Sequence, residues 1–72
     1  MIQSSYIRPT NVDMLIEVEF SDMRHHIACA AHWAEAAQLV RAEVADDYVA
    51  EVKYHLAAAR QHYSTAIGWA SR

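Results

Sequence analysis

The feature that most constrains the fold is an alanine-rich stretch without proline that fills the last two thirds of the chain. All 14 alanines lie between Ala28 and Ala70, and the single glycine is Gly68. Alanine has the highest helix propensity of any residue, so residues 22–72 are predicted to be helical. A chain of 72 residues with one cysteine has room for one small core without an internal disulfide, which excludes a two-domain enzyme or a barrel.

Two apolar stripes predict where the helices lie. Both alternate spacings of three and four residues, typical of a buried helix face, but they are out of phase with each other. The first comprises Met23, His26, Ala30, Trp33, Ala37, Val40 and Val44. The second comprises Val49, Val52, Leu56, Ala59, Tyr63, Ala66 and Ala70.

The change of phase predicts a turn. Ser21 or Asp22 can cap the first helix, and the acidic pair at 46–47 suits the start of the second. We therefore expect two helices of about 24 residues, joined near Ala45–Asp46 and folded back as an antiparallel hairpin. One continuous helix is the alternative.

The first 21 residues have a different pattern. From Val12 to Phe20, apolar and polar residues alternate with the period of a half-buried strand. Residues 2–7 also suggest an extended segment, and residues 8–11 contain turn formers. We therefore divide the chain into an extended or β-hairpin segment, 1–21, and a helical hairpin, 22–72. A short helix capped by Thr10 or Asn11 is the alternative for Val12–Phe20.

Charge and composition predict a protein partner. The net charge is −3 and lies entirely in residues 1–22, without the basic stripe that nucleic-acid binding requires. No apolar run approaches the ~20 residues of a membrane span. With no leader and one thiol, we expect a cytoplasmic protein.

Two helices cannot bury both sides of their stripes, so we expect a homodimer, most simply a four-helix bundle.

Five histidines lie in the predicted helices. His26 belongs to the first stripe and is expected to be a hydrogen-bonded core histidine. His25, Cys29 and His32 share one side of the first helix. Four residues spaced by seven share one side of the second: Tyr48, His55, His62 and Trp69. If Trp33 packs near Ala59, the two rows face each other across a groove, with His32 and His62 at one level.

Three interpretations of these rows compete. The side chains can be amphipathic residues at the wet edge of the core, which we favour. They can form a groove for a partner or a second copy. Cys29, His32 and His62 can also supply three zinc ligands. Cys29 beside a histidine could act as a nucleophile with a base, but no third group or pocket is expected, so we predict neither an enzyme nor a cofactor.

Residues 54–66 resemble the second helix of a tetratricopeptide repeat. The likeness rests on the spacing of Ala59, Tyr63 and Ala66. The residues expected in the first helix of that repeat are absent, and their places hold Glu43, Asp46, Asp47 and Ala50. The resemblance therefore implies close packing of alanine-rich helices, and no family is assigned.

The sequence favours a small, non-catalytic protein-interaction module, an inhibitor or adaptor of the kind that phages and mobile elements encode. The acidic residues expected to meet a basic partner are Asp13, Glu17 and Glu19. The second expected contact is the row of Tyr48, His55, His62 and Trp69. The alternative is a metal- or pH-responsive regulator that uses Cys29, His32 and His62.

Overall fold

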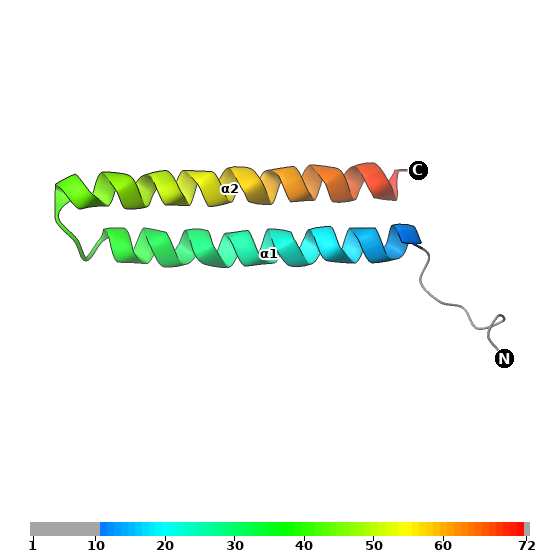
Figure 1. Ribbon diagram of the computed structural model, residues 1–72, viewed down its shortest axis with the longest axis horizontal. Helices are drawn as coiled ribbons and strands as arrows, with labels where there is room; N and C mark the ends of the chain where they lie inside the picture. The colour runs from blue at the N-terminus through cyan, green and yellow to red at the C-terminus, as the bar shows by residue number, and fades with distance from the viewer. Residues whose placement is uncertain (1–10, 72) are drawn as a thin grey trace, which may run out of the picture.

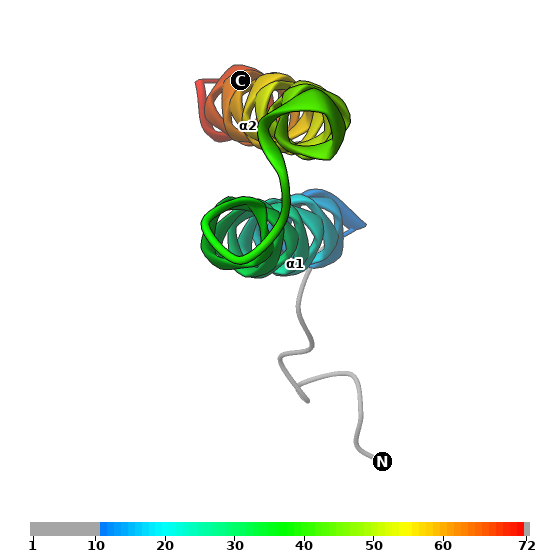
Figure 2. The same ribbon diagram turned by 90° about the vertical axis from the view of Figure 1, so that its left-hand side faces the viewer.

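The computed structural model describes residues 11–71, which form two long antiparallel helices (Figure 1). Helix α1 spans Asn11–Ala37 and helix α2 spans Ala42–Ala70. Viewed from the connection end, the helices form a slab two helices wide and one helix thick (Figure 2). The predicted helical hairpin is therefore confirmed, and the alternative of one unbroken helix is wrong.

The two helices contact each other through rows of side chains spaced alternately by three and four residues, the heptad pattern of paired helices. The row on α1 comprises Val12, Ile16, Glu19, Met23, His26, Ala30, Trp33 and Ala37. The row on α2 comprises Ala45, Tyr48, Val52, His55, Ala59, His62, Ala66 and Trp69. Among the described residues only Ala30, Ala59 and Ala66 are fully buried. The seam between the helices is therefore narrow and lined by small side chains at its closest points.

The strand predicted for Val12–Phe20 is wrong, because these residues belong to α1. Val12, Ile16 and Phe20 are spaced by four and are half-buried, whereas Met14 and Val18 remain more than half exposed. The alternating apolar residues therefore include a row spaced by four, as in a helix. The alternative of a helix is correct in type, but the segment is the first part of the 27-residue α1 and not a short separate helix. No strand occurs within residues 11–71. The extended segment predicted for residues 2–7 lies outside the described part of the chain.

The turn occupies residues 38–41, not Ala45–Asp46. After Ala37 the last turn of α1 tightens, because the amides of Gln38 and Leu39 donate to carbonyls three residues earlier at 3.2 and 3.0 Å. Arg41 is extended, with φ −66° and ψ 155°, and begins α2 without a side-chain cap. Its carbonyl instead accepts the amides of Val44 and Ala45 at 3.0 and 2.8 Å.

The first predicted stripe is correct from Met23 to Ala37, whereas Val40 lies in the turn and Val44 is exposed on α2. The second stripe is also correct only in part. Its members Val52, Ala59 and Ala66 face α1. The other large members are exposed: Val49 by 41%, Leu56 by 44% and Tyr63 by 51%. The row of Tyr48, His55, His62 and Trp69 takes their place against α1. The face of α2 that packs is thus rotated toward the histidines, and a set of larger apolar side chains is left outside.

Candidate functional site

Three histidines meet in the seam near the middle of the hairpin. His26 Nδ1 lies 2.7 Å from His55 Nδ1, a hydrogen bond between the two helices. The rings of His26 and His62 are stacked, with centroids 5.5 Å apart and planes 14° apart. His26 is therefore the hydrogen-bonded core histidine that its position predicts. We call His26, His55 and His62 the histidine cluster.

A carboxylate lies at each end of the histidine cluster. His62 Nδ1 donates to Glu19 Oε1 at 2.6 Å, which connects α2 to α1. At the other end, Glu51 Oε1 lies 3.7 Å from His55 Nε2. A proton on His55 Nε2 is favoured by this carboxylate, which leaves Nδ1 of His55 to accept the hydrogen bond from His26. Polar groups inside the seam are thus satisfied by one another.

The environment of His26 favours its neutral form. The pKa of His26 lies below the ordinary value of 6.5 because partial burial penalises the charged ring. Further lowering comes, in decreasing order, from His55, His25 and His62. Asp22 acts in the opposite direction. A cluster of neutral imidazoles can exchange hydrogen bonds, whereas the same cluster with added protons would bring like charges together.

Aromatic side chains pack near the connection. The rings of Trp33 and Tyr48 meet edge to face with centroids 5.1 Å apart. The predicted packing of Trp33 near Ala59 is therefore wrong, because the turn comes earlier than expected and shifts α2 along α1. The ring centroids of His32 and Trp33 are 5.8 Å apart, and His32 is exposed. His32 is not level with His62, because Trp33 packs on Tyr48 whereas His62 is stacked on His26.

The zinc-ligand set predicted from the sequence is not assembled. Cys29 Sγ lies 3.6 Å from His25 Nε2 on an exposed flank of α1. His62 is instead bound to Glu19 and stacked on His26. Within residues 11–71, no group of three or more histidine, cysteine, aspartate or glutamate side chains is arranged to hold a metal ion.

The residues predicted to bind a partner fall into two groups. Asp13 and Glu17 are exposed near the start of α1. Glu19 is half-buried, and its carboxylate is engaged with His62. The row of Tyr48, His55, His62 and Trp69 is half-buried against α1. This row therefore joins the two helices, and its use by another protein stays a prediction.

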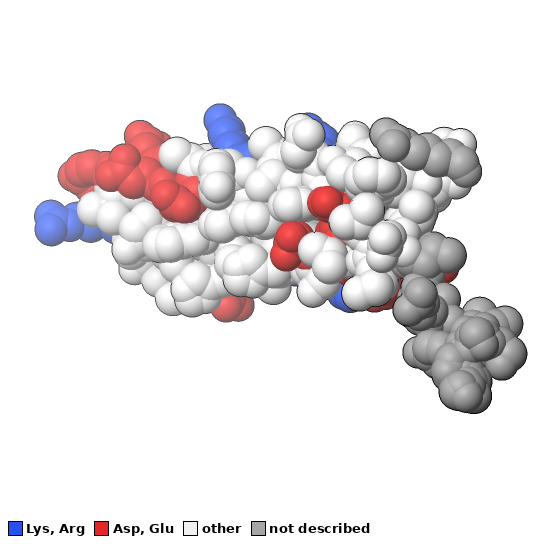
Figure 3. Space-filling model, turned by 45° about the vertical axis from the view of Figure 1, so that its right-hand side comes forward, with Lys and Arg blue, Asp and Glu red and all other residues white. Residues whose placement is uncertain are grey.

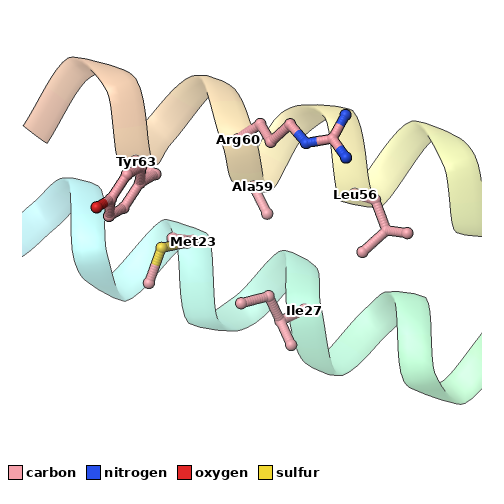
Figure 4. A pocket seen from close by; sticks show the side chains of 6 residues that line it. All are labelled: Met23, Ile27, Leu56, Ala59, Arg60 and Tyr63. Carbon is pink, nitrogen blue, oxygen red and sulfur yellow. The ribbon is translucent and has the colours of Figure 1, made fainter.

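An apolar surface that the sequence analysis assigned to the core only in part lies on one broad side of the slab. A groove of about 280 Å³ opens there, lined by Met23, Ile27, Leu56, Ala59, Arg60 and Tyr63. Figure 4 shows Tyr63 beside Met23 at one end of the groove and Leu56 opposite Ile27 at the other. Phe20 and Val49 lie seven residues before Ile27 and Leu56, two helical turns along the same sides. We call Phe20, Met23, Ile27, Val49, Leu56 and Tyr63 the apolar face.

Acidic groups are visible on the side of the slab opposite to the groove. Figure 3, which shows mainly that side, has acidic side chains at the end that carries the connection and further acidic atoms near the middle. Glu43, Asp46 and Asp47 are exposed in the first turns of α2, where negative charge is stabilised by the helix dipole. The prediction that Asp46 and Asp47 start the second helix is wrong, because α2 begins at Ala42 and Glu43 is the acidic residue of its first turn.

Comparison of the chain with protein families, with curated proteins and with solved structures finds no match. No helix within the described residues is long and apolar enough to cross a membrane. Function is therefore argued from the histidine cluster, the apolar face and the charged ends of the hairpin. The sequence signal for the cluster was present in the seven-residue spacing of His55 and His62, but the inward direction of that row was missed.

Proposed function

We propose that the chain is a small, non-catalytic protein-interaction module that acts as an inhibitor or an adaptor by binding another protein, and that it works as a homodimer. The observation that supports this is an imbalance of burial. Three alanines are the fully buried residues among those described, while eleven larger apolar side chains are exposed. Removing apolar area from water contributes about 25 cal/mol per Å², so this surface favours association.

The charge near the start of α1 indicates what kind of partner fits. Asp13 and Glu17 are exposed near that end of the slab. A basic partner surface complements this charge, and such contacts raise the association rate more than the intrinsic affinity. The proposed partner is therefore a protein with a basic contact surface.

The test is quantitative capture from cell lysate with immobilised full-length protein. Glu17→Lys is compared with Glu35→Lys, which makes the same charge change at an exposed position of α1. We expect Glu17→Lys and a rise in salt from about 50 to about 300 mM to reduce capture several-fold, because exposed charge pairs are screened over a Debye length. Glu35→Lys is expected to retain it. Failure to retain any protein at low salt would overturn the proposal.

A pH-responsive regulator is the second candidate, and the histidine cluster favours it. His26, His55 and His62 are packed within one seam, and the pKa of His26 is lowered below 6.5. Protonation of this cluster would place positive charge between the two helices. The candidate keeps the histidine chemistry expected from the sequence but moves it from Cys29 and His32 to the seam. Its test is the dependence of stability on pH.

A further inference from the structure

The apolar face is the feature of the hairpin that one chain leaves unpaired. Ile27 is exposed by 48%, Leu56 by 44% and Tyr63 by 51%, and all three line the groove on this side. The groove contains one charged side chain, Arg60. We infer that a second copy of this chain packs on the apolar face, so that the two hairpins form a four-helix bundle about a two-fold axis that passes through the groove. The inference deepens the homodimer of the proposed function.

The internal packing of one hairpin gives the first reason. Among the described residues, its seam buries three alanines to 6% exposure or less and no larger side chain to that extent. The hydrophobic contribution to folding scales with buried apolar area, and alanine supplies the least area of any apolar side chain. A chain of this size rarely gains enough from such a core without oligomerisation or another support. The larger side chains of the seam are only partly buried, so burial of the apolar face adds apolar area that the seam does not provide.

The dimensions of the broad side that contains the apolar face give the second reason. Helices of 27 and 29 residues are about 40 Å long at 1.5 Å per residue. Two such helices side by side present a width of about 20 Å. This side of the slab therefore has a footprint of about 800 Å², similar to the area that each partner buries in a stable interface of standard size. The apolar face lies in its middle part, and a second straight hairpin of the same length covers the side along its whole extent.

The position of the groove gives the third reason. The middle of Asn11–Ala37 falls beside Met23, and the middle of Ala42–Ala70 falls at Leu56. Both residues line the groove. In a two-fold interface the same patch of both subunits meets itself, and with the axis across the helices complete overlap requires the patch to lie at their middle. A central groove between Tyr63 and Leu56 can receive the corresponding side chains of the second copy.

The primary test is the solution mass of the full chain by size exclusion with light scattering. The expected result is a mass twice the 8.2 kDa of one chain. Leu56→Glu is expected to weaken dimerisation by about 30-fold or more, as loss of a central interface side chain does. Ala57→Glu places the same charge on the adjacent exposed residue, away from the groove, and is expected to remain dimeric.

Because Leu56→Glu can also unfold the hairpin, two measurements keep the test decisive. The melting temperature of the unmodified protein should rise with protein concentration, as it does when folding is coupled to dimerisation. In a Cys29→Ser background, Leu56→Cys should form an interchain disulfide under mild oxidation, whereas Ala57→Cys should not. A monomer at about 100 μM that melts at the same temperature at every concentration would overturn the inference.

The outcomes separate this inference from the proposed function. A monomer whose capture of a lysate protein is lost in Leu56→Glu would show that a different protein occupies the apolar face. That result would overturn the inference and leave the interaction module standing. A dimer that captures no protein would support the inference and contradict the inhibitor or adaptor role.

Discussion

The seam between the helices and the apolar face beside it have opposite chemistry. The seam contains three histidines and a carboxylate held by hydrogen bonds, with alanines where the helices are closest. The apolar face contains isoleucine, leucine and tyrosine that are about half exposed. In a self-sufficient monomer the larger apolar residues would be inside. The comparison teaches that the seam fixes the register and the distance between α1 and α2. The apolar face contains the exposed apolar area whose burial would further stabilise the fold.

The largest expected effect comes from widening the seam. Ala66 is 1% exposed, and Ala66→Leu inserts a larger side chain where α1 and α2 are in contact. Overpacking of this kind costs about 1–3 kcal/mol of unfolding free energy. Urea unfolding followed by circular dichroism at fixed protein concentration measures it. Ala57→Leu, at an exposed position, is the matched control and should change stability by less than about 0.5 kcal/mol. Equal effects of the two variants would contradict the close packing at Ala66.

A smaller effect is expected from the polar part of the seam. Glu19→Ala removes the acceptor for His62 Nδ1, in a pair whose side chains are 19% and 27% exposed. A hydrogen bond in such a partly buried site contributes about 1 kcal/mol. Glu17→Ala removes an exposed carboxylate from the same helix and serves as the control. A double-mutant cycle with His62→Ala isolates the interaction between the two side chains. A coupling energy of zero would show that this hydrogen bond does not stabilise the folded protein.

The dependence of folding stability on pH tests the seam separately from the apolar face. The pKa of His26 is lower in the folded protein than 6.5, so the unfolded chain binds more protons as the pH falls through that value. The contribution of His26 to stability is therefore complete above pH 6.5 and is lost progressively as the pH falls toward its folded pKa. Thermal melts between about pH 7.5 and about pH 5 measure this loss.

A matched pair of variants assigns that loss to the seam. His26→Gln removes the titrating group while the amide can still form a hydrogen bond with His55, so the slope below pH 6.5 should be shallower. His32→Gln changes an exposed histidine of the same helix and should leave the slope unchanged. An identical slope in the unmodified protein and in His26→Gln would eliminate His26 as the source.

Much of the fold could be predicted because propensity and spacing act locally. The alanine-rich composition predicted the helices, and the stripe from Met23 to Ala37 predicted the face that α1 packs. The segment Val12–Phe20 misled because its alternating apolar residues include a set spaced by four. A pattern of period two over nine residues is compatible with both geometries, and continuity with the helix that follows decided between them.

The packing face of α2 could not be chosen from hydrophobicity alone. Val52, Ala59 and Ala66 can belong either to a row with Leu56 and Tyr63 or to a row with the histidines. Hydrophobicity favours the first choice. The structure takes the second, because His55 and His62 find hydrogen-bond partners on α1. Such pairing depends on residues 29 and 43 positions apart, which no local pattern encodes.

The turn at residues 38–41 places Asn11 and Ala70 at the same end of the slab (Figure 1). In a bundle of two hairpins whose two-fold axis runs across the helices at the level of Leu56, these ends of the two copies lie at opposite poles, about 40 Å apart. Each pole of the proposed bundle therefore combines Asn11 and Ala70 of one copy with the connection of the other copy.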